Sequence, residues 1–142
     1  MTASIGAIVQ ELFQEINSHD LATIMDLCSE CVYHLPLVGE LRGEALRQVF
    51  ASVLKAFPDL QRTVNDQFTD DIHVTTRWIC TGAHKGPFMG IASTGKRVTF
   101  TGISIHRIAD GRIIEEWQEW DSLGLMQQLG VIPTFKSQDR AA

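Results

Sequence analysis

The sequence predicts an α+β protein, and two features of its pattern indicate this class. The hydrophobic period changes near residue 60 of 142, from helical spacing to strand-like runs rich in Val, Ile, Thr, Phe and Trp. Helices followed by a run of strands are typical of α+β domains. An Asp-Gly pair at 110–111, between two strand-like runs, is the signal of a tight hairpin. We expect one domain over residues 1–142, with an ordered core at 3–132 and a frayed tail at 134–142.

Three helices are expected before residue 58. Residues 4–17 place one apolar stripe at helical spacing, and Asp20 offers an N-cap for a second, shorter helix over 21–30. A third amphipathic helix covers residues 43–57. It should end at Phe57, because the residue before a proline is disfavoured in the helical conformation.

Strands account for most of the remaining chain. A short strand is expected at 31–39, and long strands are expected at 60–70, 72–86, 96–110 and 112–121, followed by a short helix at 121–130. Glycines inside strands often mark bends, and Gly82, Gly90 and Gly102 fall in this region. A strongly bent sheet with helices across its concave side would enclose a cavity.

Composition excludes several classes of function. The formal net charge is −5 and the chain has no cluster of Lys and Arg, so we expect no nucleic-acid partner. No apolar run approaches the roughly 20 residues that span a bilayer, and the N-terminus does not resemble a signal peptide. A cytoplasmic protein is therefore expected. Cys28 and Cys31 have redox or half-zinc spacing, but no second pair exists to complete a zinc site.

Several short motifs occur in a specific order between residues 57 and 121. They are Phe57-Pro58-Asp59, Arg77-Trp78, Gly82-x-His84-x-Gly86, the loop from Gly90 to Gly95, Gly102, Asp110-Gly111, Trp117 and Asp121. In this order they resemble the SnoaL-like polyketide cyclases of the nuclear-transport-factor-2-like superfamily, over roughly residues 4–130. The resemblance implies a cone-shaped fold, with N-terminal helices packed on a strongly curved antiparallel sheet. It also implies that no metal and no cofactor are used.

The last strand carries the first candidate for chemistry. Residues 115, 117, 119 and 121 share one face by the period of two. The resemblance points this face into the cavity and matches Asp121 to the catalytic acid/base aspartate of the cyclases. Asp121 could instead cap the following helix. Glu115, Glu116 and Glu119 are expected at a solvated rim or in a subunit contact, because charged residues are rarely fully buried.

His106 is the second catalytic candidate, since its strand face mixes apolar and small polar residues as a ligand pocket does. It could bond a substrate oxygen or a water at Asp121, or it could be an ordinary hydrogen-bonded histidine. Whether it reaches Asp121 depends on the hairpin register, which the sequence leaves open. The expected substrate-binding residues are His34, His84, Trp78, Trp117, Phe88, Phe100 and Met89.

The resemblance favours a cofactor-free enzyme acting on an apolar, carbonyl-bearing small molecule, in its sharpest form an aldol cyclisation of a polyketide ester. An isomerase or dehydratase on the same pocket, or a binding module without turnover, remains an alternative. An epoxide hydrolase is disfavoured, because the second aspartate of its Asp-Arg-Asp trio is missing from residues 97–107. Thr99, Thr101, Ile103 and Ile105 would expose an apolar outer sheet face, so a homodimer through the sheet is expected.

Overall fold

The structure is a computed structural model that describes residues 4–135. It has four helices and one six-stranded sheet in the strand order β2-β1-β6-β5-β4-β3. The elements in chain order are α1 Ile5–Ser18, α2 Leu21–Leu27, β1 Val32–Leu35, β2 Gly39–Leu41, α3 Gly43–Ala56, β3 Gln61–Thr69, β4 His73–Ala83, β5 Arg97–Ala109, β6 Arg112–Trp120 and α4 Ser122–Gln128. The predicted α+β class is confirmed.

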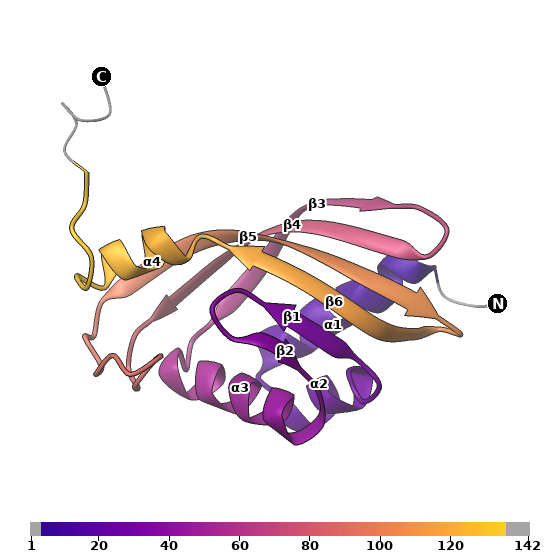
Figure 1. Cartoon of the computed structure of the whole chain (residues 1–142), viewed down its shortest axis with the longest axis horizontal. Coiled ribbons are helices and arrows are strands. Elements are labelled where there is room, and N and C mark those ends of the chain that lie inside the picture. The colour runs from indigo at the N-terminus through magenta and orange to yellow at the C-terminus, as the bar shows by residue number, and fades with distance from the viewer. Residues whose placement is uncertain (1–3, 136–142) are drawn as a thin grey trace.

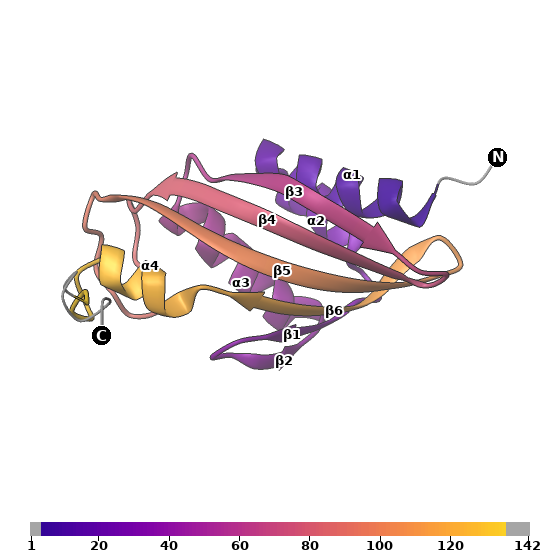
Figure 2. The same ribbon diagram turned by 90° about the horizontal axis from the view of Figure 1, so that it is seen from above.

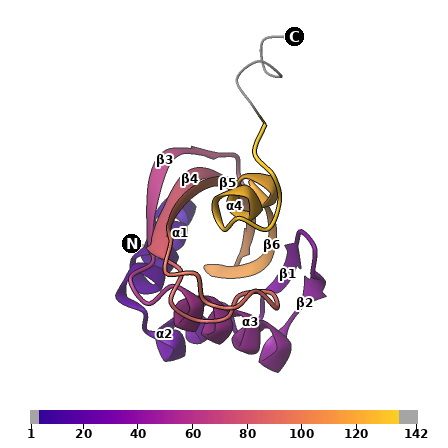
Figure 3. The ribbon, with the colours of Figure 1, turned by 90° about the vertical axis from the view of Figure 1, so that its left-hand side faces the viewer.

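The sheet curls around the helical layer. Helices α1, α2 and α3 lie on the concave side of the long strands (Figures 1 and 2). Seen end-on, the sheet forms a trough that these helices close, with α4 at its open end (Figure 3). The core between the layers includes Leu12, Phe13, Leu46, Trp78 and Leu125, all at most 3% exposed.

The helix boundaries follow from local capping. The side chains of Ser4 and Asp20 accept hydrogen bonds from the amides of Ala7 and Thr23 and so cap α1 and α2. Helix α3 ends at Ala56 with Phe57 as its C-cap, as the following proline predicts.

Asp110 and Gly111 both have positive φ, 51° and 73°, as a type I′ hairpin turn requires. This turn joins β5 to β6 and confirms the predicted hairpin. Gly102 has a different role from the expected bend. A Cβ atom there would lie 2.2 Å from the Trp78 ring, so the glycine admits an indole against the strand.

Two details differ from the prediction. The sheet is not wholly antiparallel, because β1 pairs with β6 in parallel. The strand expected at 31–39 ends at Leu35 and turns through Leu37, whose φ is 70°, into β2. This turn matters because it brings apolar side chains opposite α3.

Cys28, Cys31 and Cys80 are buried free thiols. Burial raises the pKa of Cys28 to about 12 and raises the pKa of Cys31 further. These thiols are therefore protonated at neutral pH, which is the opposite of what a reactive Cys-x-x-Cys motif needs. Within residues 4–135, no helix combines the length and apolarity needed to cross a membrane.

Candidate active site

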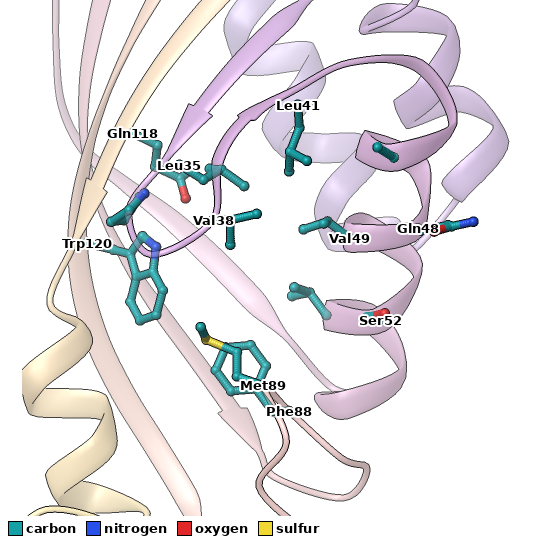
Figure 4. A pocket seen from close by; sticks show the side chains of 13 residues that line it. Leu35, Val38, Leu41, Gln48, Val49, Ser52, Phe88, Met89, Gln118 and Trp120 are labelled. Atoms are coloured by element: carbon teal, nitrogen blue, oxygen red, sulfur yellow. The ribbon is translucent and has the colours of Figure 1, made fainter.

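An apolar pocket of about 520 Å³ opens between α3 and the edge of the sheet (Figure 4). This volume lies in the range of small-molecule sites. One wall comes from α3, and the others come from the β1–β2 turn, the end of β6 and the loop after β4. Its lining residues are Leu35, Pro36, Val38, Leu41, Ala45, Gln48, Val49, Ser52, Val53, Phe88, Met89, Gln118 and Trp120.

The pocket continues inward into a narrow end of about 60 Å³. Leu35, Val49, Val53 and Gln118 line both parts, so the two spaces adjoin. Tyr33, Arg62 and Gln118 bring polar groups to the narrow end, while the rest of its lining is apolar. A ligand with an apolar body and an oxygen-bearing end would find matching surroundings here.

Glu116 and His106 form a buried carboxylate–histidine pair next to this narrow end. Their Oε1 and Nε2 atoms are in contact across β6 and β5, and the two side chains are 2% and 0% exposed. They are direct cross-strand partners, so both side chains point to the concave side of the sheet. Because a carboxylate only accepts hydrogen bonds, the ring nitrogen that faces it carries the hydrogen. The other ring nitrogen of His106, Nδ1, is buried without a hydrogen-bond partner among the described residues.

The second carboxylate oxygen of Glu116 links the pair to the pocket. It accepts a hydrogen bond of 2.8 Å from the side-chain amide of Gln118. The Tyr33 hydroxyl also hydrogen-bonds to Glu116. Burial raises the pKa of Glu116, but the charge and hydrogen bond of His106, the Tyr33 hydroxyl and the charge of Arg62 together outweigh burial and lower that pKa. The carboxylate therefore stays ionised in the protein interior.

Tyr33 is the only tyrosine of the chain. Its pKa is raised well above the usual value, first by burial and then by the nearby Cys28 and Glu116. The hydroxyl therefore keeps its proton and acts as a neutral hydrogen-bonding group at the narrow end.

The predicted orientation of Asp121 was wrong. Its side chain is exposed and accepts a hydrogen bond of 2.9 Å from the Gly124 amide, which makes it the N-cap of α4. It borders a shallow depression on the outer face, with Arg77 and Ile103, rather than the apolar pocket. The expectation that it could cap the helix is confirmed.

The resemblance assigned the wrong face of β6 to the cavity, and a β-bulge sets the face that points inward in the structure. Ile113 is buried opposite Ile108, but the next register pair is Arg107 with Glu115, which leaves Ile114 as an extra residue on β6. The bulge reverses the alternation. Glu116 and Gln118 therefore point inward, whereas Trp117 and Glu119 point outward. The expectation that Glu116 lies at a solvated rim or in a subunit contact was also wrong, because the rule that charged residues are exposed fails where His106 supplies a buried partner.

His34 and Trp117 lie on the outer face and not in the pocket, so their expected placement in the cavity was also wrong. Their rings stack with centroids 5.4 Å apart, and His34 Nε2 lies 2.7 Å from Glu115. Arg107 donates to the other oxygen of that carboxylate. These four side chains form one cluster, and the alternation of β6 after the bulge places it on the outer face of the sheet.

His84, Trp78 and Phe100 contribute to the core behind the pocket and do not line it. His84 is fully buried, with Nδ1 bonded to Thr94 and its ring against Phe57. Trp78 is also fully buried. Phe100 packs between Trp78 and Trp120, and Trp120 is the pocket-lining member of that group.

Phe88 and Met89 are the two expected substrate-binding residues that line the pocket (Figure 4). They lie at the tip of the loop after β4, where a bridge joins Phe88 to Ile91. Met89 has a φ of 50°, and its side chain is 47% exposed at the mouth of the pocket.

The sequence reasoning missed Tyr33, Arg62, Gln118 and Trp120 as site residues. Arg62 shares its strand face with Leu60 and Val64, so the period of two would have placed it on the inward face. Gln118 and Trp120 share the face of Glu116 by the same period, but the resemblance turned the opposite face of β6 inward. Tyr33 was recognised only as part of a short strand. Within residues 4–135, no group of three or more His, Cys, Asp or Glu side chains is placed to hold a metal ion.

The fold and the pocket define a class of protein: a curved α+β domain with a small-molecule cavity between its helices and its sheet. A family model described as SnoaL-like polyketide cyclase matches residues 7–129. The chain belongs to this family. Among curated proteins, none gives a significant match.

Solved structures agree with this assignment. The chain is similar to AclR of Streptomyces galilaeus, a candidate hydroxylase, at 28% identity and a TM-score of 0.88, over 99% of this chain and 90% of that one. It is similar to IdmH of Streptomyces antibioticus, a candidate polyketide cyclase, at 30% identity and a TM-score of 0.79, over 91% and 100%. It is also similar to TsrD of Streptomyces laurentii, at 31% identity and a TM-score of 0.75, over 89% and 97%.

Proposed function

We propose that this protein is a cofactor-independent cyclase that closes a ring in an apolar, carbonyl-bearing small molecule by an aldol-type reaction. One observation carries the proposal: the buried Glu116–His106 pair lies next to the narrow, polar end of an apolar pocket. The match to the SnoaL-like polyketide cyclase family supports the reaction class. A buried acid/base pair in a cavity is a common mark of a functional site.

The proposed reaction is a sequence of proton transfers around one new bond. The pair removes a proton from the carbon beside a carbonyl group, and the resulting enolate attacks a second carbonyl carbon of the same molecule. The new alkoxide then takes the proton back. In this scheme His106 holds the proton at its free nitrogen, and Glu116 orients the ring and stabilises the imidazolium.

Gln118 connects the pair to the substrate in this scheme. Its amide bonds to Glu116, and its side chain lines both parts of the pocket. Rotation of Gln118 away from Glu116 would open the pair to a ligand carbonyl. The apolar walls would hold a flexible chain folded in one reactive conformer, which supplies a large part of the catalysis.

The reaction class is tested by the mass and the ring count of the product. The purified protein is incubated with a panel of polyketide esters and aromatic diketones, and the products are separated, weighed by mass spectrometry and examined by NMR for a new carbon–carbon bond that closes a ring. Cyclisation leaves the molecular formula unchanged or removes one water, whereas hydroxylation, suggested by the description of AclR, adds an oxygen atom. Binding of the panel without any product would contradict the proposal and favour a binding module.

We also propose that two copies associate through the outer face of the sheet. Ile103, Ile105 and Trp117 are 48%, 37% and 37% exposed there, next to Thr99 and Thr101. Exposed apolar groups of this kind often meet a partner. Ile103→Glu should then convert a dimer to a monomer in size-exclusion chromatography with light scattering. A wild-type protein that stays monomeric at high concentration would contradict this interface.

A further inference from the structure

We propose that Arg62 binds the enolate that the substrate forms at the narrow end of the pocket. This inference rests on the proposed function, because it names the group that stabilises the anion formed in that reaction. It adds a cationic residue of this chain to that reaction, which the family assignment does not give.

Arg62 projects from β3 into the concave side and lines the narrow end of the pocket together with Tyr33 and Gln118. Its guanidinium carbon lies 4.1 Å from the centroid of the Trp78 ring and 5.6 Å from that of Phe13. A guanidinium stacked on an aromatic face keeps its N–H edge free for a planar partner.

The base of the Arg62 side chain is held by Asn17 at the end of α1. The Asn17 amide donates to the Arg62 carbonyl at 2.9 Å and accepts from its N–H at 2.7 Å. Trp78 is fixed in turn by a hydrogen bond of 2.9 Å to Ser104, and it lies against Gly102, where a side chain would collide with it. The cation is therefore placed before any ligand binds.

The charge of Arg62 has no direct counter-ion among residues 4–135. Every carboxylate that forms an ion pair there pairs with another cation. Among these residues Glu116 acts on Arg62 through its charge and not through an ion-pair contact, while its oxygens interact with His106, Gln118 and Tyr33. Within the described part of the chain, the Arg62 Nε atom is buried without a hydrogen-bond partner, and the polar side chain beside the guanidinium is the weakly accepting thiol of Cys80.

A half-buried cation with unused donors, next to an apolar pocket, fits an anionic oxygen supplied by the ligand. The enolate of a 1,3-dicarbonyl compound is planar and shares one negative charge between two oxygens on the same edge. This shape suits the fork of N–H donors on a guanidinium, which a simple ketone would leave partly unused.

The chemical step balances without another reactant. A proton leaves the carbon between the two carbonyl groups and goes to the Glu116–His106 pair, while the electron pair of the C–H bond spreads onto the two oxygens beside Arg62. Arg62 remains protonated throughout. The preplaced charge favours the enolate over the neutral ketone, which is the differential binding that lowers the barrier.

The test uses benzoylacetone, whose enolate absorbs ultraviolet light strongly, and benzylacetone, a monoketone of similar size. For each protein, the apparent pKa of bound benzoylacetone is read from absorption, and the affinity for both compounds is measured by calorimetry. The wild type should lower the apparent pKa of the bound diketone relative to water. Arg62→Gln should remove that decrease and weaken enolate binding by about ten- to a hundred-fold, with unchanged affinity for benzylacetone.

Two further variants complete the design. Arg62→Lys keeps the positive charge but loses the paired N–H donors of the guanidinium, so it should retain part of the decrease in the apparent pKa of bound benzoylacetone. Arg77→Gln is the matched control, because Arg77 lies on the outer face and pairs with Asp66. It should behave as the wild type. Far-UV circular dichroism and thermal melting check that each variant is folded.

The inference is overturned if Arg62→Gln lowers the pKa of bound benzoylacetone as much as the wild type does. Equal losses of affinity for benzoylacetone and benzylacetone in Arg62→Gln would also overturn it, because they would indicate a structural role of Arg62. Neither readout requires turnover. If no cyclisation occurs while the Arg62-dependent decrease persists, the proposed function fails and the enolate-binding site stands.

Discussion

Glu116 and His106 face each other directly across β6 and β5, and their paired side chains are almost completely removed from solvent. A carboxylate–histidine pair at this depth is costly to desolvate, and hydrophobic side chains of similar size would often be at least as stable. Its presence is therefore better explained by chemistry than by stability. This relationship gives the first two predictions.

Removing one partner of the pair should be strongly destabilising. Glu116→Ala should lower the free energy of unfolding by about 3–5 kcal/mol, because a fully buried histidine loses the carboxylate that its ring contacts. The double variant Glu116→Leu with His106→Leu should recover most of this loss, since it buries no unpaired polar group. Urea unfolding of the three proteins measures the difference. A double variant that is less stable than the single one would show that the pair itself stabilises the fold.

The same pair should make the free energy of unfolding depend on pH in the acidic range. The pKa of Glu116 is lowered in the folded protein relative to the unfolded value of 4.5, so the carboxylate stabilises the fold fully above about pH 4.5. This contribution is lost as the pH falls from about 4.5 through the lower folded pKa. Denaturant unfolding at several pH values should show a smaller decrease for Glu116→Gln than for the wild type. Parallel curves would mean that Glu116 does not titrate in this range.

Asp121 should act as a helix cap and not as a catalytic group. Asp121→Ala should cost about 1 kcal/mol of stability, because the Gly124 amide loses its side-chain acceptor. Asp121→Asn keeps the cap and should match the wild type in both stability and turnover. A large loss of turnover in Asp121→Asn, with normal stability and ligand binding, would restore Asp121 as the acid/base residue.

The contrast between Asp121 and Glu116 shows how far sequence reasoning reaches. Periodicity, capping residues and the Asp-Gly turn predicted the helices, the long strands and the β5–β6 hairpin, because each of these depends on local conformation. The site depended on which side of β6 faces inward. Alternation separated the two faces of β6 correctly, but the resemblance assigned the wrong face to the cavity, and nothing in the local sequence marks the extra residue at Ile114 that sets the inward face.

His106 was a sequence candidate and lies in the buried pair, whereas its partner Glu116 was assigned to the surface. The rule that glutamates are exposed holds for most positions, but it fails where a partner is supplied by another strand. That partner could be recognised only from the register of β5 against β6. The stacking of Arg62 on Trp78 likewise depends on β3 and β4 lying side by side.

The size of ligand that the pocket accepts should depend on the side chain at position 49. Val49 lines both the wide pocket and its narrow end. Val49→Phe should place a ring at their junction and weaken binding of extended ligands, while short ligands still enter the wide part. Val49→Ala is the matched variant and should accept bulkier ligands, at a modest cost in stability from the lost packing. Calorimetric titration with a homologous series of diketones measures both effects. Affinities that do not change with Val49 would place the ligand elsewhere.

The most direct test of the central claim compares the rates of Glu116→Gln and Glu119→Gln with the wild type, using a substrate that the product screen identifies. Both variants remove one carboxylate of β6, but Glu116 points inward and Glu119 points outward. Glu116→Gln should bind substrate with similar affinity and turn it over about a hundred- to ten-thousand-fold more slowly, while Glu119→Gln keeps the wild-type rate. Equal turnover by Glu116→Gln and the wild type would contradict the assignment of the buried pair as the acid/base group.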